Sequence, residues 1–184
     1  MDTTKTDLHF HWVEKARGND RTAQFELYKL YSKAMLNVSC RIVNNVEEAE
    51  DILQESFVSA FRNLDSYRGD STFGSWLKRI VINNSLNLLR KNKFDFSDVD
   101  EYEEIEENEE NDHLYDLEVN QIKLTISELP DGFRTVLSLY LLEGYDHREI
   151  AEILEISEST SKSQYNRAKK KLRTMLKEKY GYER

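Results

Sequence analysis

The sequence predicts an all-helical protein of two small domains joined by an acidic linker. The 184 residues contain one proline and six glycines, so few residues interrupt helices. Leu, Ile, Tyr and Phe recur three and four residues apart on both sides of the middle of the chain, which is the spacing of a helical face. Between them, residues 95–118 hold 13 Asp and Glu and no Lys or Arg. Such a block of like charge has too little apolar surface to form a core.

The first predicted domain, residues 1–94, contains three helices at about 23–43, 46–64 and 72–93. In each helix the apolar side chains form one stripe, and polar residues cover the other faces. The residues expected to face the core are some combination of Phe25, Tyr28, Tyr31, Met35, Val38 and Ile42 in the first helix, then Val46, Ala49, Leu53, Phe57, Ala60, Phe61 and Leu64, then Phe73, Trp76, Leu77, Ile80, Leu86 and Leu89. Gly, Asp and Ser in DSYRGDST predict a loop before the third helix.

The acidic linker conceals the charge of the rest of the chain. The net charge is −9, but outside residues 95–118 there are 22 acids against 26 bases. From Ser159 to Lys179 there are eight bases and one acid. As a flexible coil the linker spans on the order of 25–30 Å, so two tethered domains can occupy separate sites.

The second predicted domain, residues 119–184, begins its main helix at Pro130, because the missing donor of proline costs little in a first turn. The residues expected to form the buried face of that helix are Phe133, Val136, Leu137, Tyr140 and Leu141. Asp146 and Glu149 have the spacing of a capping box for a short second helix. Ser157 is placed to cap the final helix.

The last two helices, joined across Glu155 and Ile156, have the form of a helix-turn-helix, whose second helix enters the major groove of DNA. Residues of the final helix at i, i+4, i+7 and i+11 face inward, and they are Ser161, Tyr165, Ala168 and Leu172. The outward residues are then Ser159, Lys162, Ser163, Asn166, Arg167 and Lys170. Hydroxyls and amides can read base edges or grip phosphates, and cations neutralise the DNA backbone. Thr160, at the helix start, can present its hydroxyl to a phosphate.

Together the two halves resemble a bacterial RNA polymerase sigma factor of the extracytoplasmic function (ECF) group of the sigma-70 family. In the first half, residues 49–57, AEDILQESF, resemble the signature by which such proteins dock on the polymerase clamp. The segment that recognises and melts the minus-10 promoter element is similar to DSYRGDSTFGSWLKRIVINNSLNLLRK, residues 65–91. The domain that reads the minus-35 element is similar to LPDGFRTVLSLYLLEGYDHREIAEILEISESTSKSQYNRAKKKL, residues 129–172.

The resemblance implies three sets of site residues. The polymerase-binding set is Asp51, Gln54 and Glu55. The minus-10 set is Ser66, Tyr67, Arg68, Gly69, Asp70, Phe73, Trp76, Arg79, Asn83 and Arg90, with the loop at 66–72 receiving an everted base. The minus-35 set is Ser159, Thr160, Lys162, Ser163, Asn166, Arg167 and Lys170. For Trp76, a core position and a stacking platform for a base both remain open.

The resemblance also implies partners. A sigma factor binds core RNA polymerase, at the clamp of the largest subunit and the flap of the second, and recognises double-stranded and melted promoter DNA. An anti-sigma factor that sequesters the two domains is a further implied partner. The linker would run through polymerase channels made for nucleic acid, and its carboxylates would imitate a phosphate chain there.

Several residues depart from the family's pattern. Glu155 stands where glycine is common, so either its φ is positive or the turn differs. Ser161 and Tyr165 stand where aliphatic residues are usual, so the packing of the final helix must differ. Gln164 replaces a frequent arginine, which bears on the promoter sequence.

Other functional classes have less support. A free-standing helix-turn-helix regulator would leave the first domain unexplained and lacks a heptad seam for dimerisation. A helical adaptor would leave the basic final helix unexplained. No catalytic residue, cofactor or metal site is expected, because His9 and His11 do not share a helical face and no phosphate loop or nucleophile motif is present.

The compartment is expected to be the cytoplasm. No apolar run approaches the roughly 20 residues of a membrane span, and the amino end lacks the pattern of a signal peptide. Cys40 is the single cysteine and is expected to be a buried structural thiol.

Overall fold

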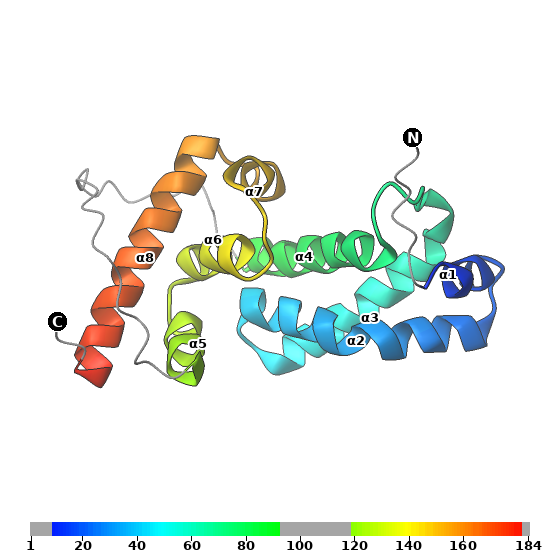
Figure 1. The fold of residues 1–184 in the computed structure, drawn as a ribbon, viewed down its shortest axis with the longest axis horizontal. Helices are drawn as coiled ribbons and strands as arrows, with labels where there is room; N and C mark the ends of the chain where they lie inside the picture. Colours follow the sequence, from blue (N-terminus) through cyan, green and yellow to red (C-terminus); the bar gives the residue numbers. More distant parts are fainter. Residues whose placement is uncertain (1–8, 93–118, 182–184) are drawn as a thin grey trace. The chain divides into compact units, whose positions relative to one another are not determined.

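The computed structural model describes residues 9–92 and 119–181, and every regular element in these two stretches is a helix (Figure 1). The predicted all-helical fold is confirmed. The chain divides into two compact units, Met1–Lys93 and Phe94–Arg184. The predicted acidic linker lies outside the described residues. Within the described stretches, no helix combines the length and the apolar character needed to cross a bilayer.

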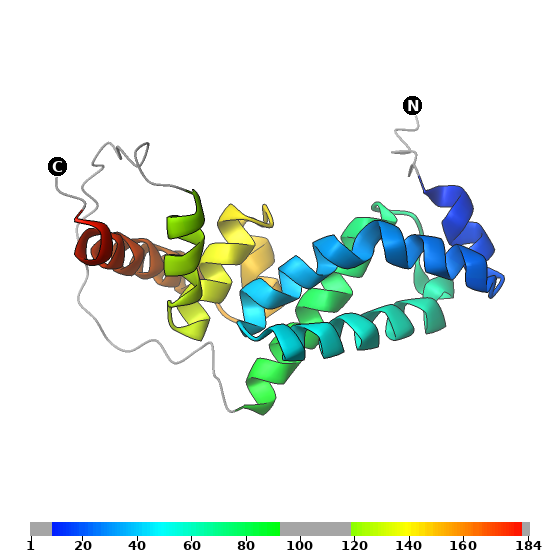
Figure 2. The ribbon, with the colours of Figure 1, turned by 90° about the horizontal axis from the view of Figure 1, so that it is seen from below.

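Unit 1 is built on three long helices, α2 (Arg21–Val43), α3 (Val46–Arg62) and α4 (Phe73–Lys91), which pack against one another pairwise (Figures 1 and 2). The short helix α1 (Phe10–Arg17) packs on α2. A single 3-10 turn, η1 (Leu64–Ser66), follows α3. The bounds of the three long helices lie close to those predicted, whereas α1 was not predicted.

Each long helix of unit 1 begins at a side chain that accepts hydrogen bonds from its first turn. The capping residues are Asp20, Asn45 and Thr72. Such a cap satisfies backbone N–H groups that have no partner within the helix and contributes ~1 kcal/mol.

Small polar side chains allow the helices of unit 1 to approach closely. Ser39, Ser56 and Ser85 are fully buried. Ser39 Oγ and Ser85 Oγ lie 3.1 Å apart across α2 and α4, and Asn84 Nδ2 donates to Ser56 Oγ across α4 and α3 at 3.0 Å. Their hydrogen bonds offset the cost of burying polar groups.

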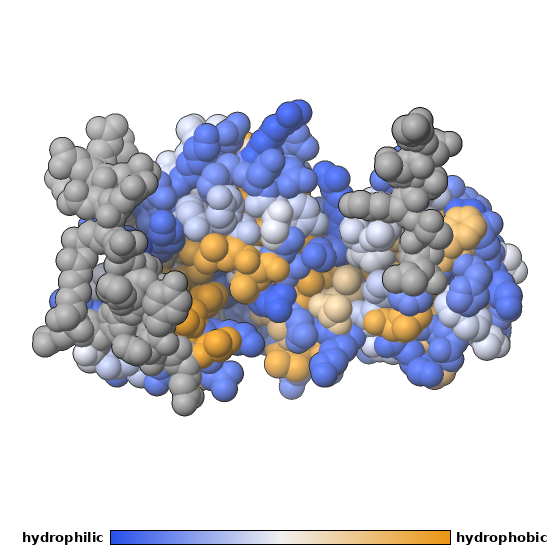
Figure 3. All heavy atoms as spheres, viewed as in Figure 1, coloured by the Kyte–Doolittle hydropathy of each residue, from blue (hydrophilic) through white to orange (hydrophobic). Residues whose placement is uncertain are grey.

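Some side chains expected in the core of unit 1 lie on its surface instead. Phe25 is 59% exposed, Tyr28 37% and Val46 60%. On α2 the inward residues include Ala23 and Leu27, both fully buried. Because residues two apart on a helix point about 200° apart, Phe25 cannot share their face. Small apolar patches are visible among hydrophilic residues in Figure 3.

Cys40 is partly exposed, not fully buried as predicted. Burial is still the main reason that the pKa of its thiol is raised, and Glu50 raises it further. A thiol with a raised pKa is a poor nucleophile near neutral pH.

Unit 2 contains α5 (Val119–Ser127), α6 (Asp131–Leu141), α7 (His147–Leu154) and α8 (Glu158–Tyr180). The long helix α8 contacts the other three. One core cluster of this unit consists of the buried residues Ile126, Leu129, Leu137 and Ala168, with Ile122, Phe133, Tyr165, Leu172 and Met175 packed against them.

The end of α6 differs from the prediction. Leu141 is 52% exposed and Tyr140 36%, although both were expected in the buried face. Leu141 is the last residue of α6, and the chain then turns, with the N–H of Tyr145 donating to the carbonyl of Leu139 at 3.0 Å. A side chain in a last turn has helical neighbours on one side only, so it is less covered.

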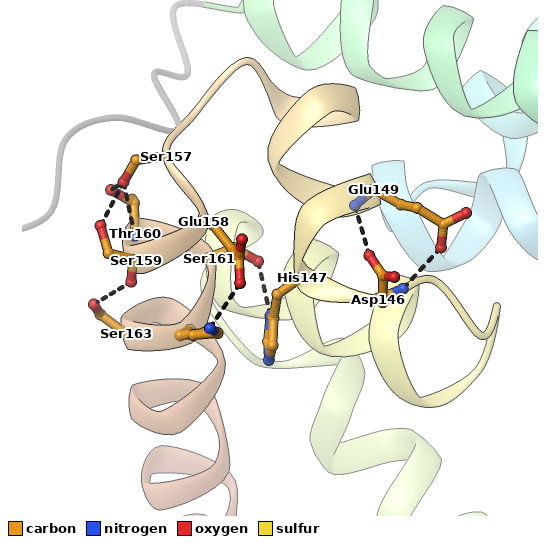
Figure 4. A network of polar contacts seen from close by, with 10 residues as sticks. Asp146, His147, Glu149, Ser157, Glu158, Ser159, Thr160, Ser161 and Ser163 are labelled. Carbon is orange, nitrogen blue, oxygen red and sulfur yellow. Dashed lines mark hydrogen bonds and ion pairs between the residues drawn. The ribbon is translucent and has the colours of Figure 1, made fainter.

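The two caps predicted for the helix-turn-helix are confirmed (Figure 4). The N–H of Glu149 donates to Asp146 Oδ1 at 2.8 Å, and the N–H of Asp146 donates to Glu149 Oε2 at 2.9 Å. Ser157 Oγ accepts from the N–H of Thr160 at 3.0 Å. Glu155 ends α7 with φ of 61°, so the positive φ is the alternative that holds, at a cost of about 1 kcal/mol for a residue with a side chain.

The altered packing of α8 is centred on His147. Its ring stacks on Tyr140, with centroids 4.6 Å apart and planes 21° apart, and meets Tyr165 edge-on at 5.4 Å. His147 Nδ1 lies 2.9 Å from the hydroxyl of Ser161, which is fully buried (Figure 4). Ser161 and Tyr165 of α8 therefore pack on α7 through polar and aromatic contacts.

The first prediction concerns Gly74, where α4 packs closely on α2. A Cβ at this position would lie 2.7 Å from Tyr31 Cε1. Gly74→Leu should therefore displace the ring and lower the free energy of unfolding by about 1–3 kcal/mol. Thermal unfolding followed by circular dichroism measures this. Asn87→Leu, at an exposed position of the same helix, should change it by less than about 0.5 kcal/mol. Equal midpoints for the two variants would contradict the tight contact.

The second prediction concerns pH. Burial lowers the pKa of His147, Lys162 lowers it further, and Glu158 and Asp146 act in the opposite direction. Below the ordinary histidine value of about 6.5 the unfolded chain therefore binds more protons than the folded one, so unit 2 should lose stability as the pH falls below that value.

His147→Gln replaces the imidazole with an amide, which can form a hydrogen bond with Ser161 but does not titrate. Urea unfolding of both proteins at about pH 7.5 and about pH 5.5 should give a smaller loss of stability for the variant at the lower pH. A loss as large as in the parent protein would show that His147 does not carry the effect.

Candidate nucleic-acid and protein interfaces

The outward face of α8 presents the polar and basic side chains predicted for the minus-35 element. Exposed members are Ser159, Lys162, Ser163, Asn166 and Lys170, and half-buried members are Thr160 and Arg167. In contrast, Gln164 is 4% exposed. The residue that stands for a frequent arginine of the family therefore faces the interior, which the sequence did not indicate.

Hydroxyl groups at the start of α8 are ordered by one another. Ser157 Oγ lies 2.8 Å from Ser159 Oγ and 2.7 Å from Thr160 Oγ1 (Figure 4). Ser163 Oγ donates to the carbonyl of Ser159 at 2.8 Å. These hydroxyls lie at the positive end of the helix dipole, where a phosphate is favoured.

Lys162 forms an exposed ion pair with Glu158. Its Nζ lies 2.7 Å from Glu158 Oε1, with the two side chains 57% and 51% exposed. The hydrogen bond from Lys162 lowers the pKa of the Glu158 carboxyl. Because both groups are in contact with water, the pair contributes little to stability, and a phosphate can replace the carboxylate.

The loop that follows η1 is closed on itself. The hydroxyl of Tyr67 donates to the carbonyl of Ser71 at 2.6 Å. Gly69, between them, has φ of +81°, a conformation that side chains rarely adopt. The exposed minus-10 residues here are Ser66, the last residue of η1, and Arg68, Gly69 and Asp70 in the loop.

Two members of the minus-10 set have rings that lie inside unit 1. For Phe73 this agrees with its predicted place on the core face of the helix, whereas the burial of Tyr67 was not predicted. Tyr67 is 5% exposed and Phe73 is fully buried. Their rings meet edge-on at 6.0 Å, and each lies within 6 Å of the ring of Trp76, at 5.4 and 5.8 Å. Aromatic packing holds these rings in the core because it buries large apolar areas. Trp76 is half-buried, so one part of it packs in the core and another part is accessible.

The remaining minus-10 residues share one side of α4. Arg79 and Asn83 are exposed, and Arg90 is half-buried. At 100° per residue, positions four and eleven residues beyond Arg79 fall within about 40° of it. The three side chains and the accessible part of Trp76 thus follow one edge of the helix.

The predicted polymerase-binding residues lie on the outer face of α3. Asp51, Gln54 and Glu55 are exposed. Leu53 and Phe57, 5% and 3% exposed, anchor the opposite face in the core. The helix therefore presents carboxylate and amide groups outward from a rigid support, as a basic protein surface requires.

Helix α1 is the part of the site region that the sequence did not predict. Its last residue, Arg17, donates from Nη2 to the carbonyl of Tyr67 at 3.0 Å. Val13 and Ala16 are buried, and their spacing is a weak helical signal. Nothing in the pattern indicates a contact fifty residues along the chain.

Among residues 9–92 and 119–181, no group of three or more His, Cys, Asp or Glu side chains could hold a metal ion.

Two family models match the chain. Residues 27–94 match sigma-70 region 2, and residues 120–172 match sigma-70, region 4. The first begins within α2 and covers α3, the loop and α4 of unit 1, and the second covers most of unit 2.

Curated relatives agree with these matches over most of the chain. The RNA polymerase sigma-H factor of Pseudomonas aeruginosa is 34% identical, over 90% of this chain and 94% of the relative. The ECF RNA polymerase sigma factor SigW of Bacillus subtilis is 31% identical, over 90% and 95%. The ECF RNA polymerase sigma-E factor of Escherichia coli K12 is 34% identical, over 85% and 88%.

Solved structures support the fold. The sigma factor RpoE from Bartonella quintana, in complex with the anti-sigma factor NepR, matches with a TM-score of 0.57 at 22% identity, over 83% of this chain and 95% of that one. CnrH, in complex with the cytosolic domain of CnrY, matches with a TM-score of 0.55 at 20% identity, over 91% and 96%. With both halves matched in order, the chain belongs to the ECF RNA polymerase sigma factors of the sigma-70 family, which act in transcription initiation and are not enzymes.

Proposed function

We propose that this sigma factor uses three surfaces during initiation. The outer face of α3 binds the clamp of the largest polymerase subunit. The loop after η1 and the outer edge of α4 bind the melted minus-10 element. The outward face of α8 binds the double-stranded minus-35 element, while unit 2 rests on the flap of the second polymerase subunit.

The observation that best supports this proposal is the capped helix-turn-helix of unit 2. The capping box at Asp146 starts α7, and Glu155, with its positive φ, ends it; the cap at Ser157 then starts α8. Its exposed face then carries hydroxyl, amide and cationic groups together. These are the groups that read base edges and neutralise phosphates in a major groove.

The loop of unit 1 supports the minus-10 assignment. Arg68 and Asp70 are exposed on either side of Gly69, above a rigid aromatic base that includes the half-buried Trp76. Extruding a base from a duplex costs a few kcal/mol, and contacts with such a surface return part of that cost.

Promoter recognition should depend on the polymerase. Outside residues 95–118 the excess of bases over acids is small, so each unit alone is expected to bind free DNA weakly. When polymerase holds both units, the second DNA contact becomes intramolecular and is strengthened by its effective concentration.

Regulation by an anti-sigma factor is part of the proposal. The matched structures of RpoE and CnrH contain the anti-sigma factor NepR and the cytosolic domain of CnrY, respectively. By analogy, this chain binds an anti-sigma factor that covers its polymerase-binding surface. It acts in the cytoplasm, where polymerase and DNA are present.

The polymerase surface can be tested on α3. Asp51→Ala/Gln54→Ala/Glu55→Ala should weaken binding to core RNA polymerase by roughly tenfold or more, because it removes charged and hydrogen-bonding groups from the interface. Fluorescence anisotropy of labelled protein with core polymerase measures the dissociation constant. Glu152→Ala/Glu178→Ala removes the same charge from exposed positions of unit 2 and serves as control. Equal affinities for the two variants would exclude the α3 surface.

The minus-35 surface can be tested on α8 with holoenzyme and a library of duplexes. Lys170→Ala should weaken all promoter complexes similarly and reduce the salt dependence by about one counterion, whereas Asn166→Ala should alter sequence preference by roughly 1–3 kcal/mol at one position. Mobility shift assays over a range of salt concentrations distinguish these effects. Lys123→Ala, on exposed α5, is the charge-matched control. Specific complexes that form without core polymerase would instead indicate a free-standing regulator.

A further inference from the structure

Helix α1 has a structural role that neither family region accounts for. It spans Phe10–Arg17, whereas the region 2 match begins at residue 27. The helix buries Val13 and Ala16 and packs on both α2 and η1. It is therefore an ordered part of unit 1, placed beside the turn that leads into the minus-10 loop.

The guanidinium of Arg17 joins α1 to that loop. Its Nη2 donates to the carbonyl of Tyr67 at 3.0 Å, and its Nη1 donates to Glu14 Oε1 at 2.5 Å. Its Nε lies 3.9 Å from Asp65 Oδ1, but the Asp65 side chain is 91% exposed, so this ion pair is weak. The bond to the carbonyl is partly buried and is the main contact between α1 and the loop, while the exposed Glu14 contributes a second hydrogen bond to the guanidinium.

Tyr67 transmits this contact to the exposed part of the loop. Its carbonyl is held by Arg17, its ring is buried against Phe73 and Trp76, and its hydroxyl is bonded to Ser71. The residues between Tyr67 and Ser71 are thus closed into a small ring of chain. A displacement of the Tyr67 backbone would move Arg68, Gly69 and Asp70 together.

The other end of α1 meets the same aromatic cluster. His9, which precedes the first turn, has Nδ1 2.8 Å from the hydroxyl of Tyr31. The ring of Tyr31 meets Phe73 edge-on at 5.4 Å. The helix therefore reaches the base of the loop through two independent contacts, directly by Arg17 and indirectly by His9.

We propose that α1 is a brace for the minus-10 loop and that Arg17 is a positioning residue for capture of the melted minus-10 strand. This rests on the proposed function of the loop. Arg17 acts through the Tyr67 backbone and does not touch DNA. A loop held in one arrangement binds a strand without first losing conformational freedom, so removal of the brace weakens capture.

The test uses holoenzyme and a single-stranded oligonucleotide of the non-template minus-10 sequence, taken from a promoter selected with the parent protein. Arg17→Ala should weaken binding of this strand roughly tenfold, because the loop must then be ordered when the strand binds. Arg17→Lys should recover part of the loss, since an ammonium can donate to the Tyr67 carbonyl but cannot keep the guanidinium geometry. Lys15→Ala removes a charge from an exposed position of the same helix and should leave binding unchanged.

Hydrogen exchange provides a readout that does not depend on DNA. In the full chain, Arg17→Ala should speed amide exchange across residues 65–72, whereas α2 and α4 should exchange as in the parent protein. Core polymerase binding should also stay the same, since α3 is not altered. Faster exchange throughout unit 1 would show a general loss of stability and overturn the proposal.

A variant of the loop distinguishes DNA binding by the loop from the effect of Arg17 on the loop. If Arg68→Ala/Asp70→Ala weakens strand binding but Arg17→Ala stays within twofold of the parent protein, the loop binds DNA and the brace is wrong. If the loop variant binds as the parent does, the proposed role of the loop fails, and the brace proposal fails with it. Weakened binding in both variants, with partial recovery in Arg17→Lys, supports the brace.

Discussion

Close approach of α2, α3 and α4 is the constraint on which unit 1 depends. Buried serines lie between these helices, and the contacts Ser39–Ser85 and Asn84–Ser56 connect them in pairs. Larger side chains there would force the helices apart, because interiors are packed without spare volume. The inner faces of α3 and α4 thereby fix the distance between their outer faces. The proposed polymerase surface and the proposed DNA edge are therefore held in a constant geometry by residues that touch neither partner.

The sequence was sufficient for features that depend on neighbours along the chain. The capping box at Asp146, the cap at Ser157 and the outward face of α8 each follow from spacing within one helix, and all were found where predicted. The resemblance to ECF sigma factors was likewise carried by short motifs, and it is confirmed by the matches to regions 2 and 4. These matches account for both halves, which a free-standing regulator or an adaptor would not.

Features that depend on contacts between distant segments could not be predicted. Tyr67 was grouped with residues that face DNA, yet its ring packs with Phe73 and Trp76 in the core. His147 was an isolated histidine in the sequence, but fourteen residues later Ser161 meets it across the turn. A helical stripe shows which side chains share a face, but not which of two apolar faces is covered by another helix. That choice depends on how the chain returns on itself.

The residue at the turn, Glu155, affects the free energy of both the folded and the unfolded chain. Glycine adopts a positive φ without strain, so it would relieve about 1 kcal/mol in the folded turn. Glycine also gives the unfolded chain more conformations to lose on folding, which costs about 0.4–1 kcal/mol. At a positive φ the strain of a side chain exceeds this entropic gain, so glutamate is the less stable of the two residues at this turn. The left-handed conformation therefore persists because the helices on both sides of the turn, α7 and α8, hold it in place.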